Sequence, residues 1–235
     1  MTKRACKRAF ALFVSFLLIL SLFVFSGYAE EAKVFHKSES GEKRIALTFD
    51  DGPHPRITRK ILEVLDEFGI SSKATFFVIG QNVQNYPEAM KLIIDSGCEI
   101  GNHTFSHKNV RQMNRCELEE EFEKCRRLLS ENFSVEPTLL RPPEGFCSEA
   151  LYSMSDEKHY NIILWSIDTL DWAHTPSDQI AKNVLGNAKG GDIVLMHDYV
   201  AGSHGTCDAL RIIIPELLER GFEFVTVSEL IKNEI

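Results

Sequence analysis

Short apolar runs and amphipathic stretches alternate along this chain from Lys43 onward. The first run, 45–49, is mostly apolar, which is typical of a strand buried on both faces. The stretch 57–68 then carries apolar residues three or four positions apart, the spacing of one helix face, and Gly69 ends it. The same pattern continues to the C-terminus. It predicts further strands at 74–79, 98–101, 138–140, 161–167, 192–196 and 222–226, helices at 87–96, 117–132, 148–158, 176–187 and 206–220, and a short terminal helix.

The repeated order of strand and helix predicts an α/β fold, in which helices cover a parallel sheet of about seven strands. Such a sheet is either closed as a barrel or open and doubly wound. Neither GxGxxG nor GxxxxGKS/T follows any expected strand, so a nucleotide-binding fold has no support and we favour a barrel. Because no linker or low-complexity segment interrupts the pattern, we expect one domain over 43–232, preceded by a short lead-in segment, 30–42.

The N-terminus differs from the rest of the chain, because basic residues there precede a long apolar stretch at 9–25. Gly27 and Ala29 have the small side chains that signal peptidase accepts at its cleavage site. We expect residues 1–29 to be a signal peptide cleaved near Ala29, with an uncleaved N-terminal membrane anchor as the alternative. In both cases the basic residues place the rest of the chain outside the cytoplasm.

The charge of the chain argues against a nucleic-acid partner. Residues 1–29 hold four of the 26 Lys and Arg and none of the 34 Asp and Glu, so residues 30–235 carry 22 positive and 34 negative side chains, a net charge of −12. Nucleic-acid binding is driven largely by neutralisation of phosphates, which an acidic domain does not provide. A neutral or cationic partner fits this charge better.

Five of the six cysteines remain after the leader, an odd number that leaves at least one thiol without an intramolecular partner in an exported protein. Cys116 and Cys125 are nine positions apart on one expected helix, which is too far for a disulfide. A Cys147–Cys207 disulfide is conceivable. Otherwise we expect most of the thiols, Cys98 among them, to be small core residues.

Polar clusters follow several of the expected strands, each at the point where a strand ends. In a barrel of parallel strands these ends meet at one face, which is where such folds carry their chemistry. The adjacent carboxylates of Asp50 and Asp51 resist joint ionisation unless a cation is near. Taken alone, this pair could equally belong to a solvated turn. The clusters are Asp50-Asp51, His103-Thr104-Phe105-Ser106-His107, Arg141-Pro142-Pro143-Glu144-Gly145, Asp168-Thr169-Leu170-Asp171-Trp172 and His197-Asp198.

His103 and His107 stand four positions apart, a spacing that places both imidazoles on one face of a helical turn. Together with one carboxylate they form a ligand set for a divalent metal ion that leaves positions open for water and substrate. We expect Zn²⁺ first, and Co²⁺, Mn²⁺ or Ni²⁺ also fit, because these ligands are permissive. Taken alone, the two histidines would be unrelated loop residues.

The other clusters each allow a structural and a functional interpretation. Arg141 is either a structural partner of a carboxylate or the group that keeps a catalytic aspartate oriented. His197 follows an apolar run and is either a satisfied core residue or a general acid. Asp171 is either a loop acid or the carboxylate that holds His197 as an imidazolium. Trp172 is either a core indole or the wall of a small apolar pocket.

Taken together and in order, the five clusters resemble the polysaccharide deacetylase family, the NodB-homology domain of carbohydrate esterase family 4. That family has the motifs TFDDGP, H(S/T)xxH, an RPPYG-like turn, DxxDW and an apolar run that ends in histidine. The resemblance covers the whole expected domain and implies a distorted, incomplete (β/α) barrel. The matching segments are 48–53, 103–107, 141–145, 168–172 and 193–197.

The resemblance implies that the two adjacent acids have different roles, which spacing alone does not assign. Asp50 matches the catalytic base of the family, and Arg141 matches the residue that tethers this base. Asp51 matches the aspartate that binds the metal together with two histidines, here His103 and His107.

The remaining roles implied by the resemblance concern the acid and the substrate. His197 matches the catalytic acid and Asp171 its partner, while Trp172 and Leu195 match the lining of the pocket for the acetyl methyl group. Glu144 departs from the family, because its position in the RPPYG-like turn is often tyrosine. Its backbone N–H is expected to help hold the oxyanion, and its carboxylate at the mouth could favour a substrate with a free amine.

For function, the resemblance implies metal-dependent hydrolysis of N-acetyl groups on GlcNAc units of a cell-wall polysaccharide, with release of acetate. Peptidoglycan comes first as the polymer for an exported protein, and chitooligosaccharide next. An O-acetyl esterase acting on xylan or another glycan would use the same site, and a catalytically silent wall-binding module is the non-enzymatic alternative. The implied partner is the polysaccharide at the cell wall or outer membrane face, and neither nucleic acid nor a protein partner is implied.

Overall fold

The first expected strand forms as predicted and lies inside the sheet. In the computed structural model, which describes residues 33–199 and 205–235, this strand is β2, Arg44–Asp50. It pairs in parallel with β3, Ala74–Val78, on one side and with β8, Ile193–His197, on the other. Neighbours on both sides and burial of every residue after the first explain why the run is almost continuously apolar.

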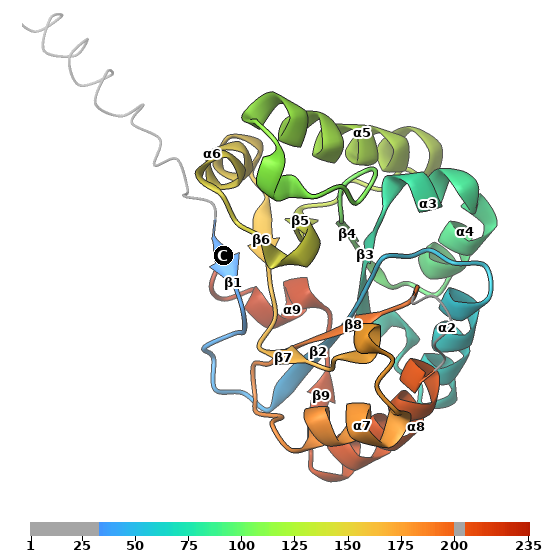
Figure 1. Cartoon of the computed structure of the whole chain (residues 1–235). Helices are drawn as coiled ribbons and strands as arrows, with labels where there is room; N and C mark the ends of the chain where they lie inside the picture. The colour runs from blue at the N-terminus through green and yellow to red at the C-terminus, as the bar shows by residue number, and fades with distance from the viewer. Residues whose placement is uncertain (1–32, 200–204) are drawn as a thin grey trace, which may run out of the picture. The chain divides into compact units, whose positions relative to one another are not determined.

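The paired strands of the sheet all run parallel, and the sheet curls into an open, incomplete barrel (Figure 1). This confirms the expected fold class. The described residues form nine strands rather than about seven, because β1 was not expected and the run at 161–167 divides in two. The strand order is β1 (Val34–Phe35), β6 (Asn161–Ile163), β5 (Leu139–Leu140), β4 (Glu99–Asn102), β3, β2, β8 and β7 (Ile167–Asp168), and β9 (Glu223–Phe224) pairs with the start of β2.

The division of the run at 161–167 shows how the barrel approaches closure. Its first part, β6, pairs with β1 and β5, whereas β7 pairs with β8 at the other end of the strand order. Between them, Leu164 N donates to Phe35 O at 2.7 Å and Ser166 N donates to Ile193 O at 3.0 Å. The segment therefore runs from β6, which lies next to the edge strand β1, through a bend at Ser166 to β7 at the opposite edge, so the prediction of a single strand was wrong.

The pleat of β2 decides which of its side chains enter the barrel. Leu47 and Phe49 belong to the cluster between sheet and helices, whereas Ala46 belongs to an inner cluster with residues of α9, Val227–Ile231. Successive side chains of a strand point to opposite faces. Asp50 therefore shares the inner face with Ala46, at the carboxyl end of the strand.

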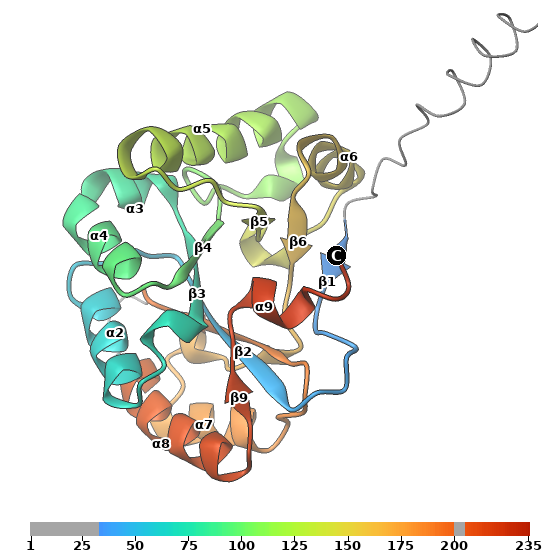
Figure 2. The same cartoon turned by 180° about the vertical axis from the view of Figure 1, so that it is seen from behind.

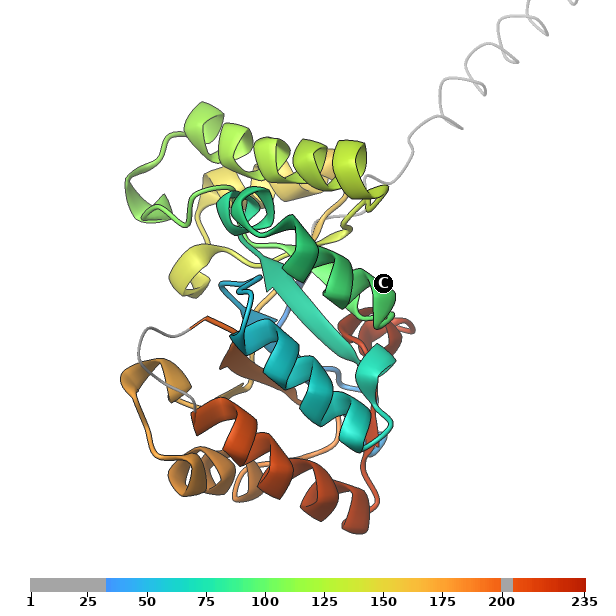
Figure 3. The ribbon, with the colours of Figure 1, turned by 90° about the vertical axis from the view of Figure 1, so that its right-hand side faces the viewer.

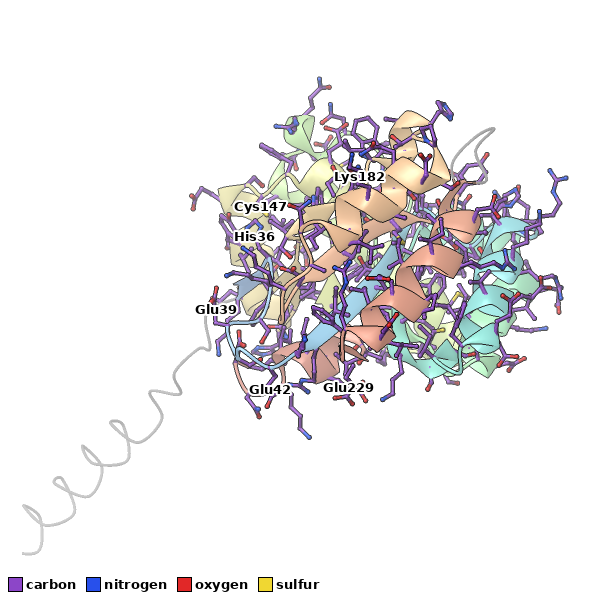
Figure 4. All side chains as sticks on the ribbon, turned by 90° about the horizontal axis from the view of Figure 1, so that it is seen from below. His36, Glu39, Glu42, Cys147, Lys182 and Glu229 are labelled. Atoms are coloured by element: carbon purple, nitrogen blue, oxygen red, sulfur yellow. The ribbon has the colours of Figure 1, made fainter. Side chains whose placement is uncertain are left out.

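Helices form a continuous belt along the outside of the sheet, and neighbours in the belt pack in the order α7, α8, α2, α4, α3, α5, α6. Figures 2 and 3 show α2 between α8 and α4, and Figure 4 shows α7, which carries Lys182, beside α8. The sequence missed α3, which has a single buried apolar side chain, Val83. The bounds are α2 Ile57–Glu67, α3 Gly80–Asn85, α4 Pro87–Asp95, α5 Arg115–Phe133, α6 Glu149–Lys158, α7 Ser177–Leu185 and α8 Gly205–Glu219.

The five cysteines of the described residues are free thiols, so the conceivable Cys147–Cys207 disulfide does not form. Cys98, Cys125 and Cys207 are buried, as expected of small core residues. Burial raises the pKa of Cys98 and Cys125 to about 12 and that of Cys207 to about 11, which leaves these three thiols unreactive at neutral pH.

The expected signal peptide or membrane anchor, 1–29, lies outside the described residues. Within residues 33–199 and 205–235, no helix has the length and apolar character needed to cross a membrane. The boundaries 30–42 and 43–232 stay predictions. The segment before 43 nevertheless contributes to the sheet, because β1 pairs with β6 and Lys37 forms an antiparallel bridge with Asp192.

Candidate active site

Asp50 ends β2 on the inner side of the barrel, where it meets Arg141 directly after β5. Arg141 Nη1 lies 2.7 Å from Asp50 Oδ1, and both side chains are almost completely buried. Three more hydrogen bonds hold the guanidinium, to Thr48 Oγ1 at 2.8 Å, Ile163 O at 3.1 Å and Leu164 O at 2.9 Å. A guanidinium held at so many points has one orientation, so it fixes the Asp50 carboxylate as well.

Asp51 follows with a backbone φ of 76°, in the left-handed region. A residue other than glycine adopts this conformation at a cost of roughly 1–2 kcal/mol. The turn brings the Asp51 carboxylate next to two imidazoles, because Oδ1 lies 3.5 Å from His103 Nε2 and 3.2 Å from His107 Nε2. One ligand atom from each of the three residues lies within 4.8 Å of the others. The backbone strain is thus located where three metal-binding side chains meet.

The two histidines do not share a helical turn, so the predicted local geometry was wrong although the pairing was right. Residues 103–107 form a loop after β4, in which Thr104 and His107 have positive φ angles of 68° and 52°. Glu121 of α5 holds this loop, because its carboxylate accepts hydrogen bonds from the backbone N–H and the hydroxyl of Ser106 at 2.8 and 2.7 Å. Nothing in the sequence distinguished Glu121 from the other acids of its helix.

The donor set fits a divalent metal ion. His103 Nδ1 lies 2.7 Å from Arg141 O, the backbone contact by which metal-binding histidines direct their other nitrogen toward the ion. Asp51 Oδ1 is buried without a hydrogen bond of ordinary geometry to any described residue, which a cation would compensate. Burial raises the pKa of Asp51, but the contacts with His103 and His107 outweigh it and bring that pKa below its ordinary value. An ionised carboxylate beside two imidazoles can hold a divalent ion.

His197 ends β8 and is in register with Asp50 of the neighbouring strand. Its Nδ1 lies 2.7 Å from Asp171 Oδ1, and the other oxygen of this fully buried carboxylate accepts hydrogen bonds from His197 N and Thr206 Oγ1, both at 2.8 Å. Burial lowers the pKa of His197, but the hydrogen bond and charge of Asp171 raise it to about 9. His197 is therefore an imidazolium at neutral pH, as the functional interpretation of this pair requires.

A cavity of about 550 Å³ joins these groups at the carboxyl ends of the strands. Eight of the ten predicted site residues line it, and the other two, Arg141 and Asp171, are fully buried and contact Asp50 and His197. The structure thus brings together all ten of these residues. The lining residues among the ten are Asp50, Asp51, His103, His107, Glu144, Trp172, Leu195 and His197.

Apolar side chains form part of the cavity wall. Trp172 and Leu195, which were expected to line a methyl pocket, both line the cavity. Trp172 is 53% exposed, whereas Leu195 is buried. Trp165 also lines the cavity. It was not among the predicted site residues, because it falls inside the single strand predicted at 161–167. A Cβ on Gly145 would lie 2.8 Å from the Trp165 ring, so the turn after Arg141 packs closely on this indole.

Glu144 lines the cavity from an exposed position, with a backbone φ of 58°. Its carboxylate lies 3.4 Å from Arg111 Nε, and the Arg111 guanidinium lies 4.3 Å from the centre of the Phe146 ring. The carboxylate at the mouth is thus already paired with a cation. Because both side chains are exposed and water screens the pair, Arg111 only moderates the charge of Glu144, and a preference for a substrate with a free amine stays a prediction.

Comparison with known proteins agrees with this architecture. The family model described as polysaccharide deacetylase matches residues 37–163. The chain is 40% identical over 195 residues to a peptidoglycan-N-acetylglucosamine deacetylase of Bacillus cereus, which covers 82% of this chain and 90% of that protein. A crystal structure of the Bc1960 peptidoglycan N-acetylglucosamine deacetylase matches with a TM-score of 0.81 and 37% identity, over 88% of this chain and 95% of that one. A structure described as a CE4 family pseudoenzyme from Bacillus anthracis matches with a TM-score of 0.78 and 27% identity, over 84% of this chain and 68% of that one.

Proposed function

Because the chain belongs to the polysaccharide deacetylase family, a family of hydrolases, we propose that it removes N-acetyl groups from GlcNAc units of a cell-wall polysaccharide and releases acetate. One observation carries this proposal. A tethered carboxylate, Asp50, and a cationic imidazole, His197, lie in register on adjacent strands and line one cavity with a metal-binding triad. A base and an acid that line one cavity beside a metal site are groups that hydrolysis of an amide uses.

We assign the metal to Asp51, His103 and His107, with Zn²⁺ as the first choice and Co²⁺, Mn²⁺ or Ni²⁺ as ions that the same ligands accept. When bound, the ion would polarise the acetyl carbonyl and lower the pKa of a water molecule in the cavity. His103 is oriented for this role by its contact with Arg141 O, and Asp51 by the strained turn after β2.

Asp50 is proposed as the general base. Arg141 occupies its Oδ1, which leaves Oδ2 to accept a proton from the attacking water. Oδ2 lies 3.8 Å from His103 Nε2, so this oxygen is on the side of the metal ligands. The four hydrogen bonds on Arg141 keep the base from rotating as its charge changes.

His197 is proposed as the general acid. Its Nδ1–H is held by Asp171, so Nε2–H is the proton available for the leaving amine. An amine is a poor leaving group unless it is protonated, which makes a histidine with a pKa of about 9 a suitable donor. The Glu144 N–H is proposed to help hold the oxyanion, and Trp172 and Leu195 to contact the acetyl methyl group.

Peptidoglycan is the proposed polymer, because two of the similar proteins named above are peptidoglycan-N-acetylglucosamine deacetylases; chitooligosaccharide comes next. Such a substrate places the enzyme outside the cytoplasm, which agrees with a signal peptide cleaved near Ala29 or with an N-terminal anchor. We propose residues 43–232 as the catalytic domain, and no nucleic acid or protein partner is required for the reaction.

The test is release of acetate by the purified full chain from peptidoglycan, N-acetylated chitooligosaccharides and acetylxylan, with and without a chelator. We expect release from the N-acetylated substrates that stops on chelation and returns with Zn²⁺. Release from acetylxylan alone would identify an O-acetyl esterase instead. Binding to peptidoglycan without release from any substrate, in metal-loaded protein, would make the chain a silent module comparable to the pseudoenzyme it resembles.

A further inference from the structure

A wholly buried carboxylate, Asp198, packs against the loop that carries Asp51, and the reaction proposed above does not use it. Its side chain has no solvent exposure, and its backbone N–H donates to Asp50 O at 3.0 Å, which ties the ends of β8 and β2 together. A Cβ on Gly52 would lie 2.0 Å from Asp198 Oδ2. The residue after Asp51 must therefore be glycine for this carboxylate to fit.

Thr58 connects Asp198 to the far side of the same loop. The Thr58 hydroxyl donates to Asp198 Oδ2 at 2.5 Å and accepts a hydrogen bond from His54 N at 2.7 Å. Thr58 is fully buried in the first turn of α2. The Asp198 carboxylate thus links the loop 51–54 to the start of α2, while the backbone N–H of the same residue holds the end of β2.

The turn at Asp51 needs such support, because a left-handed residue with a side chain persists only where its surroundings determine its conformation. On the opposite side, Asn82 Nδ2 donates to Asp51 O at 2.7 Å and Ile79 N donates to Gly52 O at 2.9 Å. These bonds fix the carbonyl groups of the turn. On the other side of the turn, the Asp198 carboxylate packs against Gly52.

We propose that Asp198 is a positioning residue for the metal site, which acts through Gly52 and Thr58 to keep Asp51 in its strained turn. This inference rests on the proposed role of Asp51 as a metal ligand. Removing a group that orients a metal ligand typically lowers metal affinity about 10- to 100-fold, even though the group never touches the ion.

The experiment measures Zn²⁺ affinity of the metal-stripped full chain by titration calorimetry, with circular dichroism to confirm folding. We expect Asp198→Ala to weaken Zn²⁺ binding about 10- to 100-fold. Asp198→Asn keeps an oxygen that can accept the Thr58 hydroxyl, so its affinity should stay close to that of the unchanged protein. Thr58→Val should weaken binding in the same direction but by less, since Asp198 still packs against Gly52.

Asp192→Ala is the matched control, because Asp192 is a second buried aspartate just before the other end of β8. It accepts hydrogen bonds from Ser166 Oγ at 2.8 Å and Lys189 N at 2.7 Å, so its loss removes comparable contacts far from the metal ligands. We expect it to lower the unfolding temperature without changing Zn²⁺ affinity.

Unchanged Zn²⁺ affinity in folded Asp198→Ala, or an equal loss in Asp192→Ala, would overturn the inference. If Asp198→Ala does not fold, Thr58→Val decides, and unchanged affinity there counts against the proposal. Because Zn²⁺ binding is measured without substrate, failure of the positioning role is distinguishable from failure of the deacetylase proposal, which would show as absent acetate release.

Discussion

Two guanidinium–carboxylate pairs lie at the same cavity, and they differ in almost everything except their chemical groups. In the first pair, Arg141 Nη1 lies 2.7 Å from Asp50 Oδ1, and the two side chains are 0% and 4% exposed. In the second pair, Arg111 Nε lies 3.4 Å from Glu144 Oε2, and the two side chains are 50% and 59% exposed. Asp50 and Glu144 both line the cavity.

The difference shows that burial, rather than charge, decides what such a pair can do. Removing one partner of a buried pair leaves an uncompensated charge and costs about 3–5 kcal/mol, whereas an exposed pair contributes on the order of 0.5 kcal/mol because water screens it. Arg141 can therefore fix the orientation of Asp50. Arg111 can only moderate the charge of Glu144.

The largest effect is expected for Asp50→Asn, which removes the proposed base from the buried pair. The rate of acetate release should fall about 10²- to 10⁴-fold, the usual contribution of a general base. Zn²⁺ affinity should change little, and calorimetry on the stripped protein checks this. Asp51→Asn is the paired variant and should weaken Zn²⁺ binding. If instead Asp50→Asn lost the metal while Asp51→Asn kept metal and activity, the two roles would be reversed.

Arg141→Ala and Arg111→Ala test the comparison through stability. Arg141→Ala should lower the free energy of unfolding by about 3–5 kcal/mol, because Asp50 is left buried without its partner. Arg111→Ala should lower it by on the order of 0.5 kcal/mol. Urea unfolding followed by circular dichroism measures both. Equal losses would show that burial does not separate the two pairs.

Asp171→Asn tests a third pair, in which the cation is His197. Asp171 raises the pKa of His197 to about 9, so kcat/KM should fall as the pH rises through about 9. In Asp171→Asn this decline should move toward the ordinary imidazole pKa of about 6.5. Because the pKa of His197 is raised by folding, the stability it contributes is complete below about pH 6.5 and is lost as the pH rises through about 9. Unfolding temperatures across this range provide the second measurement.

Glu144→Gln is the control for that pH profile, since it removes a carboxylate at the cavity without touching His197. If the decline of kcat/KM at high pH does not move in Asp171→Asn, or moves equally in Glu144→Gln, the assignment of His197 as the acid is contradicted.

The smallest effect is expected for Glu144→Gln and Arg111→Ala on catalysis. Both side chains are exposed and partly neutralise each other, so kcat should stay within about threefold of the unchanged protein, consistent with the small energy of such pairs. Any change should appear in KM and diminish at high salt. A tenfold loss of kcat in either variant would mean that the exposed Arg111–Glu144 pair takes part in the reaction.

Most strands and helices could be predicted because hydrophobic periodicity is a local property. Helix α3 was missed for a local reason, because it has a single buried apolar side chain, but two other departures from the prediction have a common cause in distant partners. The run 161–168 has the pattern of one strand, but it leaves strand geometry at 164–166, with a bend at Ser166, and its two ends pair with different strands as β6 and β7. His103 and His107 have a helical spacing, but Glu121 holds them in a loop instead. Such partners are distant in the chain, so no local pattern could indicate them.

The candidate site shows the same division between local and distant information. Residue types and their order after each strand were sufficient to single out Asp50, Asp51, His103, Arg141 and His197, because chemistry of this kind needs particular side chains at strand ends. Distances and burial came only from the folded chain. Asp50 and Arg141 are 91 positions apart, and their separation in space depends on two strands meeting inside one barrel. Whether a carboxylate is tethered, bound to a cation or screened by water depends on its local dielectric and its neighbours, and both exist only after the chain has folded.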